Sequence, residues 1–203
     1  MTPMVDLAFL LVTFFMLTAQ FRPEEAVVVD TPSSHSQSPV PTENLMTISV
    51  DSAGRVFWNF TDKKVRGEVI KEFAKRYNLT LDPQQQQRFV NLDDIGIPAQ
   101  QLGTYLNLNS GAERKAMDQA SPGIPIDSTN DQLLDWIRIT QLIFSSGSGG
   151  INPIIALKGD GNVDYSTMSK VIKIFQSPTV KISKFKMITD LEESRMNGPA
   201  NQK

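Results

Sequence analysis

The sequence predicts an α+β fold carried by a single N-terminal transmembrane helix. Three observations support this prediction: an apolar opening stretch, a Pro- and Ser-rich segment after it, and alternating short strand and amphipathic helix patterns in the remainder. We therefore expect a transmembrane helix over residues 1–22 and a flexible linker over 23–43. A small domain over 44–190 should pack helices on one face of a mixed sheet, and residues 191–203 should form a disordered tail.

Composition limits the classes of function open to this chain. It has 203 residues, a net charge of −2 and 40% apolar residues, which suits one folded domain and argues against a basic nucleic-acid surface. It has no cysteine, and its single histidine, His35, lies in the Pro/Ser-rich stretch, where a solvated linker residue is expected. Disulfides, thiolate zinc sites and histidine-based triads are therefore excluded. We expect no metal, no cofactor and no enzymatic activity.

The apolar opening contains one carboxylate. Between residues 5 and 21 the only charged side chain is Asp6. An aspartate near a helix centre costs about 2.5–3.5 kcal/mol on the insertion scale, whereas each Leu, Val or Phe contributes about 0.3–0.6 kcal/mol favourably. The ten such residues in this stretch make insertion favourable by a small margin. Two alternatives stay open: a cleaved signal peptide, and a shorter span starting at Leu7 with Asp6 at headgroup level.

Most of the polar residues of this helix gather on one side. At about 100° per residue, one strip holds Thr2, Asp6, Leu10, Thr13, Leu17 and Gln20. Lipid would leave the polar groups of the strip unsatisfied, so we expect it to face a protein partner or a hydrated cavity. A desolvated carboxylate can exchange protons near neutral pH, and its two forms prefer different surroundings. The pattern therefore predicts a proton relay.

Downstream, alternating apolar residues around the turn DSAG predict a hairpin over residues 45–60. The segment DKKVRGEVIKEFAKRY has helical spacing with Asp62 as its cap, and its charged residues are expected to form a solvated face. Residues 78–150 are interpreted as an insertion of short helices and loops. This region includes a helix in NDQLLDWIRITQLIF and a flexible break at SSGSGG.

The final third predicts a strand-helix-strand unit without catalytic residues. NPIIALKG predicts a strand, DYSTMSKVIKIFQS a helix, and VKISKFKMITDLE an edge strand with Lys181 and Ser183 or Lys184 toward water. LKGDGN lacks the spacing of a phosphate loop or an EF-hand, so it is interpreted as a turn. Asp93 and Asp94 fit a loop or cap role better than a cation site.

The opening MTPMVDLAFLLVTFFMLT closely resembles the single transmembrane helix of the ExbD/TolR biopolymer-transport family, in which a Thr-Pro pair precedes an aspartate and an apolar run. The C-terminal IIALKGDGNVDYSTMSKVIKIFQSPTVKISKFKMIT resembles that family's periplasmic strand-helix-strand unit. With the hairpin, the resemblance covers about half of the chain. Residues 78–150 exceed the compact form of the family and resemble insertions in ExbD-like proteins of the Bacteroidetes type.

The resemblance implies a proton-channel or stator subunit of an inner-membrane ExbB-ExbD-TonB-type complex, which uses the proton motive force to energise outer-membrane transport. By residue match it assigns the proton relay to Asp6, matches Thr2 and Pro3 to the preceding pair, and places Thr13 where a polar residue lines the path. The implied partners are an ExbB-like multi-span subunit, a TonB-like energy transducer and a second copy of the chain. The implied topology is a cytoplasmic N-terminus and a periplasmic domain.

Two other functions remain open at this point. One is a TolR-like subunit of the Tol system for envelope integrity, and the other is a periplasmic binding or scaffold module for which the helix is only a membrane tether. Topology rests on the resemblance, because Arg22 follows the span and the positive-inside rule alone would place the domain in the cytoplasm. A basic segment preceding Met1 in a longer protein would remove this conflict.

Overall fold

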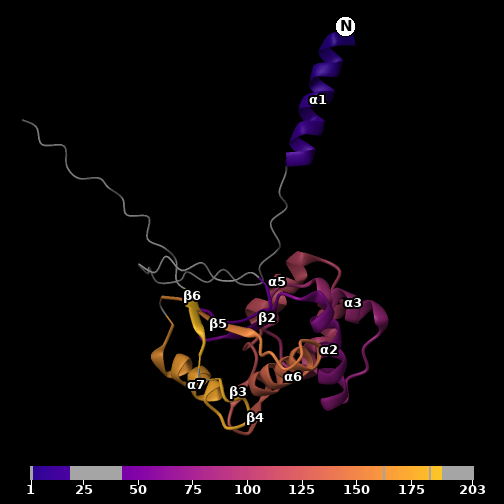
Figure 1. Cartoon of the computed structure of the whole chain (residues 1–203). Coiled ribbons are helices and arrows are strands. Elements are labelled where there is room, and N and C mark those ends of the chain that lie inside the picture. The colour runs from indigo at the N-terminus through magenta and orange to yellow at the C-terminus, as the bar shows by residue number, and fades with distance from the viewer. Residues whose placement is uncertain (1, 19–42, 162, 183, 189–203) are drawn as a thin grey trace, which may run out of the picture.

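The computed structural model describes residues 2–18, 43–161, 163–182 and 184–188, and confirms the α+β class with a mixed sheet (Figure 1). The predicted tail lies outside the described residues, as does the predicted linker with His35, apart from Glu43. The elements are, in chain order, α1 (Thr2–Thr18), β1 (Leu45–Val50), β2 (Val56–Phe60), α2 (Lys63–Arg76), α3 (Pro83–Asn91), α4 (Ala99–Asn107), α5 (Gly111–Ala120), β3 (Ile126–Asp127), β4 (Asn130–Asp131), α6 (Gln132–Gly147), β5 (Ile154–Gly159), α7 (Tyr165–Phe175) and β6 (Lys186–Ile188).

The larger sheet has four strands in the order β2-β1-β5-β6. β1 pairs antiparallel with β2 and parallel with β5, and β5 pairs parallel with β6. Ile48 lies opposite Trp58 on one side and Leu157 on the other, and all three side chains are fully buried. The predicted hairpin is therefore confirmed. The parallel pairing of β1 with β5 requires a long crossover, and residues 61–153 provide it.

Within the described residues, the last strand is shorter than predicted. The edge-strand prediction covered residues 180–192, of which 183 and 189–192 are not described, and β6 contains Lys186–Ile188 among the rest. Lys181 has φ of 51°, a left-handed conformation that does not continue a strand. The next N–H, that of Ile182, donates to the carbonyl of Phe175 at 2.9 Å and ties this segment to the end of α7. Lys181 is exposed as predicted, and Ser183 lies outside the described residues.

Helix α2 begins at its predicted cap, but one of its charged residues is not on the solvated face that the sequence predicted. Asp62 Oδ1 accepts a hydrogen bond from the N–H of Lys64 at 2.7 Å. The prediction that the charged residues form a solvated face is wrong for Arg66, which is 3% exposed. Arg66 lies three, four and seven residues before the apolar positions that this helix buries, namely Val69, Ile70 and Phe73. Helical periodicity therefore directs its side chain inward.

An aromatic stack connects the crossover to the sheet. The ring of Trp136 in α6 stacks on Phe73 of α2, with centroids 3.6 Å apart, and on Trp58 of β2 at 4.9 Å. Phe89 of α3 adds a third stacked contact with Trp136 at 5.7 Å. All four rings are buried. Residues 78–150 thus share one hydrophobic core with the hairpin and α2.

Two segments of the crossover cover the outer edge of β2. The backbone of Trp58 exchanges hydrogen bonds with Ile95, donating at 2.8 Å and accepting at 2.9 Å. The N–H of Ile124 donates to the carbonyl of Val56 at 2.9 Å. An uncovered strand edge invites pairing with other chains, so these bonds protect the sheet on this side.

Helix α6 confirms the predicted helix in residues 130–144 and extends beyond it. The predicted break over residues 145–150 begins too early, because the helix continues to Gly147. The hydroxyls of Ser145 and Ser146 donate to the carbonyl of Leu142 at 3.2 and 2.7 Å, which satisfies them inside the helix. The N–H of Gly150 then donates to the carbonyl of Ser145 at 2.8 Å and closes the C-terminus.

Candidate functional site

Helix α1 carries the residues that the sequence predicted as a site. It begins at Thr2, and Pro3 lies in the first turn, where a missing backbone N–H leaves no hydrogen bond unmade. Asp6 follows one turn later and is exposed. Asp6 and Thr13 are seven residues apart, which places them on one side of the helix about 10 Å apart along its axis.

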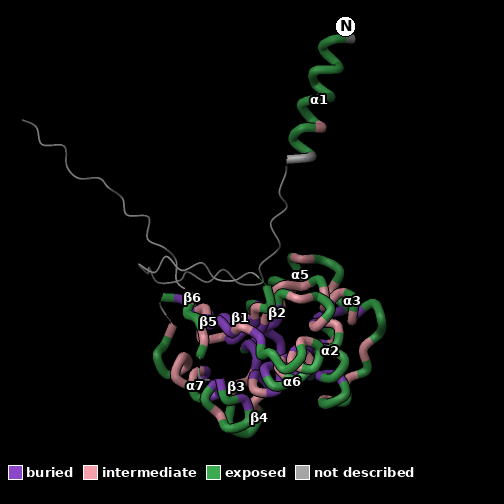
Figure 2. Tube along the Cα trace, viewed as in Figure 1, coloured by how far each residue is buried: buried purple, intermediate pink, exposed green. Residues whose placement is uncertain are grey.

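Apart from Asp6 and Thr13, the side chains described between positions 3 and 16 of α1 are apolar. Figure 2 shows the helix exposed along its described length, with Thr13 the one half-buried residue between positions 3 and 16. Among the large apolar residues of α1, exposed fractions range from 56% at Val12 to 80% at Met4. The exposed large apolar residues are Met4, Val5, Leu7, Phe9, Leu10, Leu11, Val12, Phe14, Phe15 and Met16. A helix with this much exposed apolar surface fits a lipid or protein environment rather than water.

The two polar side chains described within α1 differ in how they are satisfied. The hydroxyl of Thr13 donates to the carbonyls of Phe9 and Leu10, both at 2.9 Å, so its donor needs no partner outside the helix. Asp6 forms no side-chain hydrogen bond or ion pair within the part of the chain that the structure describes. The carboxylate is therefore the group of α1 that needs a partner in a low-dielectric environment.

Among the described residues, no helix combines the length and the apolar character that crossing a membrane requires. The described part of α1 has 17 residues, and the predicted span over 1–22 extends past its end into residues that are not described. The transmembrane span therefore stays a prediction.

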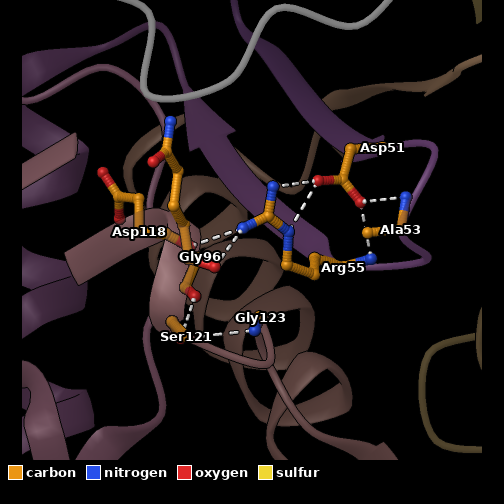
Figure 3. Close-up of polar contacts among 8 residues, drawn as sticks. Asp51, Ala53, Arg55, Gly96, Asp118, Ser121 and Gly123 are labelled. Carbon is orange, nitrogen blue, oxygen red and sulfur yellow. Dashed lines mark hydrogen bonds and ion pairs between the residues drawn. The ribbon is translucent and has the colours of Figure 1, made fainter. Parts of the chain in front are cut away.

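A second polar feature lies in the folded domain, where Arg55 connects the hairpin turn to the crossover. Its guanidinium pairs with Asp51, with Nε donating at 2.7 Å and Nη2 lying 2.5 Å from Oδ2. Figure 3 shows the same guanidinium reaching the end of α5, where Nη1 donates to the carbonyls of Asp118 at 2.8 Å and Gln119 at 3.0 Å. A cation at a helix C-terminus also interacts favourably with the helix dipole.

Ser121 connects the two crossover segments that cover β2. Its hydroxyl donates to the carbonyl of Gly96 at 3.1 Å and accepts from the N–H of Gly123 at 3.3 Å (Figure 3). A residue beside each of these glycines, Ile95 or Ile124, bonds to the edge of β2. The two segments therefore hold each other as well as the strand, and any change that moves one of them should move both.

Arg66 is buried, and the hydrogen bonds of its side chain within the described residues go to an amide and to backbone carbonyls. Its Nη1 donates to Oδ1 of Asn59 at 3.1 Å and to the carbonyl of Asp93 at 3.0 Å, and its Nη2 donates to the carbonyl of Phe89 at 3.1 Å. The buried Nε has no hydrogen-bond partner among the described residues. Burial lowers the pKa of Arg66 to about 10. A buried cation with an unmade hydrogen bond is costly, and the rings of Trp58 and Phe89, whose centroids lie 5.7 and 5.4 Å from its guanidinium carbon, offset part of that cost.

Asp118 on α5 is a second buried charged residue with one unmade hydrogen bond. The side chain is 1% exposed, and its Oδ2 accepts from the hydroxyl of Tyr105 at 3.0 Å, while Oδ1 has no partner in the described chain. Burial raises the pKa of Asp118 to about 6, although the Tyr105 hydrogen bond and the charges of Arg55 and Arg114 oppose this shift. Burial next to this carboxylate also raises the pKa of Tyr105.

Comparison with known proteins identifies the family. Residues 1–190 match the family described as biopolymer transport protein ExbD/TolR. The chain belongs to the ExbD/TolR family. Comparison with curated proteins finds no match, and comparison with solved structures finds none.

Membership confirms the resemblance and extends it from about half of the chain to α1, the sheet and the crossover together. ExbD/TolR proteins are not enzymes, are typically associated with the inner membrane, and work with membrane partners in complexes. The candidate residues Thr2, Pro3, Asp6 and Thr13 all fall on α1 at the start of the matched range. The family match does not by itself assign a role to any of them.

The sequence prediction for this ExbD/TolR chain missed Arg55, Arg66 and Asp118. Arg66 had a readable signal, because it occupies the apolar stripe of a helix whose other charged residues do not. Arg55 and Asp118 had no such signal in the sequence, because the guanidinium of Arg55 bonds to the carbonyl of a residue 63 positions away. Their association depends on where the crossover returns to the hairpin.

Replacing Asp118 with asparagine should remove a pH dependence from the stability of this domain. Because the folded-state pKa is raised from 3.8 to about 6, the ionised carboxylate destabilises the fold above pH 6, and this penalty disappears as the pH falls below about 4. The penalty is on the order of 2–3 kcal/mol at pH 7. Urea unfolding of the full chain, followed by circular dichroism at pH 4.5 and 7, should show Asp118→Asn gaining stability over wild type mainly at pH 7. An equal difference at both pH values would contradict the assignment.

Proposed function

We propose that this ExbD/TolR chain is a proton-channel and stator subunit of an inner-membrane complex of the ExbB-ExbD-TonB type, which uses the proton motive force to energise outer-membrane transport. The observation that carries the proposal is Asp6. It is a carboxylate without a partner in the described chain, on a helix whose surface is otherwise apolar. Such a group in a membrane protein is a functional-site hypothesis by default.

The membrane span is the first part of the proposal. The 17 described residues of α1 are about 26 Å long at 1.5 Å per residue, slightly short of the roughly 30 Å hydrocarbon layer. The adjoining Ala19, Gln20 and Phe21 would supply the remaining length in the proposed span over residues 1–22. We place the N-terminus in the cytoplasm and the domain over residues 44–190 in the periplasm, with residues 23–43 as the linker and 191–203 as a disordered tail.

The mechanism follows from the chemistry of one carboxylate. Within a ring of ExbB-like subunits, Asp6 would take a proton from one side and release it to the other. The neutral form tolerates an apolar neighbour, whereas the charged form requires water or a cation, so each protonation step changes the preferred position of α1 relative to the ring. Thr2, Pro3 and Thr13 would shape and line the path beside Asp6. The proposed partners are the ExbB-like subunit, a TonB-like transducer and a second copy of this chain.

A second candidate within the same family is a TolR-like subunit that serves envelope integrity through the Tol system. The family description itself names both ExbD and TolR, and the chemistry of Asp6 would be the same in either system. Identification of the third partner, TonB-like or TolA-like, separates the two candidates. A chain whose helix is only a membrane tether would need neither partner.

Co-purification tests the proposed complex. The tagged full chain, expressed with a multi-span ExbB-like protein from the same genome, should retain that protein through detergent extraction and size exclusion. The matched control replaces residues 2–18 with an unrelated single-pass helix of equal length, which preserves the anchor but removes Asp6 and its surroundings. We expect the partner to be lost from this control. Equal retention by both chains would reject an intramembrane role for α1 and favour the tether.

A further inference from the structure

The last third of the domain carries an excess of positive charge that the proposed function does not use. Residues 154–188 contain six lysines and only two carboxylates, although the whole chain has a net charge of −2. The six are Lys158, Lys170, Lys173, Lys181, Lys184 and Lys186. The salt bridges formed within the described residues involve other side chains, so direct ion pairing there leaves these lysines unneutralised.

Four of these lysines lie at one end of the larger sheet. Strands β1, β5 and β6 run parallel, so all three begin at the same end. Helix α7 connects the far end of β5 back toward the start of β6, and Lys173 is in its last turn (Figure 1). The N–H of Ile182 donates to the carbonyl of Phe175 at 2.9 Å, which keeps the connecting segment beside the end of α7. The four lysines at this end, hereafter the basic end, are Lys173, Lys181, Lys184 and Lys186, and all are exposed.

Neighbouring segments do not cancel the charge of the basic end. Residues 43–44 and 61–64 adjoin the start of β1 and the end of β2, which pair, and they contribute two lysines and two carboxylates, which balance. The opposite end of the sheet, formed by residues 51–55 and 160–164, has three aspartates and one arginine. The next carboxylates after the lysines are at residues 190–193, and they follow the other end of β6 in the sequence. The sheet is therefore positive at one end and negative at the other.

Two exposed apolar side chains accompany the lysines. Ile151 is in the segment that leads into β5, and Met187 follows Lys186 in β6. Their exposed fractions are 66% and 59%, and outside α1 the other large apolar side chains described as exposed are Leu142 and Tyr165. Lysines around a small exposed apolar surface are typical of proteins that lie on a lipid bilayer, where the lysine stems also contact apolar groups.

The proposed linker joins the domain at the basic end. β1 begins at Leu45, and its pairing with Ile154 places this residue where β5 also begins. The 21 residues of the proposed linker, 23–43, therefore attach the proposed span to the positive end of the sheet. Fully extended, a chain of this length reaches about 70–75 Å, so contact between the basic end and the bilayer is an intramolecular event.

We propose that the basic end docks on anionic phospholipid headgroups of the membrane that anchors α1. The lysines would lie against the phosphates, and Ile151 and Met187 would enter the headgroup region between them. An acidic protein segment would match the charge, but the attachment of the linker at this end favours the bilayer. The inference rests on the proposed membrane span and is independent of proton transfer by Asp6.

A fluorescent label tests the docking, because the chain has no cysteine of its own. Thr179→Cys places one label in the exposed segment between α7 and β6 without removing a lysine, and Ser52→Cys places one in the exposed hairpin turn at the opposite end. Each labelled full chain is reconstituted into vesicles of phosphatidylcholine, either pure or with phosphatidylglycerol as about a third of the lipid. A nitroxide on the lipid headgroups quenches labels that approach the bilayer surface.

We expect quenching at position 179 to be severalfold greater in the anionic vesicles than in the neutral ones, and quenching at position 52 to be weak in both. Salt at about 1 M should abolish the difference, since the Debye length falls to about 3 Å. Lys181→Glu combined with Lys184→Glu should reduce the docking equilibrium constant at least about tenfold, because each lysine near an anionic surface contributes roughly a factor of five.

The matched control combines Lys71→Glu with Lys75→Glu, which makes the same change in net charge on the exposed surface of α2. We expect this variant to retain the quenching at position 179, and unchanged circular dichroism confirms that each variant is folded.

Three outcomes would overturn the proposal. The first is equal quenching at position 179 in both kinds of vesicle. The second is no quenching there in anionic vesicles, which would assign the basic end to an acidic protein segment. The third is equal loss of quenching in both charge-reversal variants, which would mean that net charge alone decides.

Flotation of the full chain with neutral vesicles at about 1 M salt, where surface charge is screened, reports the span separately. A chain that floats without lipid-dependent quenching disproves the docking alone. A chain that fails to float disproves the span on which the docking rests.

Discussion

Replacing Asp6 with asparagine should reduce energy-dependent uptake to the level of a strain that lacks the gene. Asparagine has nearly the same shape as aspartate but cannot ionise, so a relay through this position has no proton to carry. Insertion should not suffer, because the charged side chain is the costly one, at about 2.5–3.5 kcal/mol near a helix centre. The measurement is siderophore uptake in cells, with the amount of chain in the membrane fraction determined in parallel.

Thr13, which is proposed to line the path, supplies the comparison that separates the relay from its lining. It lies on the same side of α1 as Asp6, but its hydroxyl is already bonded to the carbonyls of Phe9 and Leu10. Thr13→Val keeps the shape of the side chain and removes only an internally satisfied donor, so uptake should fall by no more than a few-fold. If Asp6→Asn retains uptake at normal expression, the proton-relay proposal is wrong. If Thr13→Val is as inactive as Asp6→Asn, a hydrated path along the whole strip is required instead.

Local signals in the sequence were enough to predict the elements that frame the fold. The cap at Asp62 and the hairpin turn each depend on side-chain to backbone bonds within a few residues, so the sequence contains the whole arrangement. Asp51 shows this directly, since its carboxylate accepts from the N–H groups of Ala53 in the predicted turn and of Arg55 immediately after it. Patterns of period two and 3.6 then placed the buried faces correctly for most strands and helices.

Features that depend on distant segments could not be predicted in the same way. Nothing near Arg55 indicates that its guanidinium caps α5, because the two carbonyls lie 63 and 64 residues away. The late start of β6 depends on a tertiary feature of the backbone, because the alternating pattern begins at Val180 while Lys181 is left-handed and Ile182 bonds back to the end of α7. The candidate relay at Asp6 is the opposite case. Its signal is local, because a carboxylate in an apolar stretch is unusual wherever the rest of the chain lies.

Together, these contacts give the crossover a structural role that its sequence does not reveal. It covers the edge of β2 through Ile95 and Ile124, adds Trp136 and Phe89 to the aromatic stack, and receives Arg55 from the hairpin. The crossover thus protects a strand edge, completes the core and gives Arg55 its partners on α5. Removing it as a unit would expose the edge of β2 and the aromatic stack and would leave Arg55 without the α5 carbonyls, so residues 78–150 are part of the folded core of this ExbD/TolR chain.

Replacing Gly123 with alanine should strongly destabilise the crossover. Its φ of 84° lies in the left-handed region, where a Cβ costs about 1–2 kcal/mol. That Cβ would also lie 2.6 Å from the backbone nitrogen of Val56, a contact no side-chain rotation can relieve. Moving away would stretch the bond from Ile124 to Val56, worth about 1 kcal/mol. We expect a loss of about 2–4 kcal/mol in urea unfolding and a melting temperature lower by roughly 5–15 °C.

Gly103→Ala is the matched control, because the same methyl group is added inside α4 where no atom lies within 4 Å. Helix propensity alone should act there, raising stability by about 0.5–1 kcal/mol. Opposite signs for the two substitutions would show that the backbone contact between Gly123 and β2 exists in solution. A neutral Gly123→Ala would mean that the 121–124 segment is not held against the strand. That result would contradict the claim that this segment covers the edge of β2. It would also contradict the claim that Ser121 links it to the segment at Gly96.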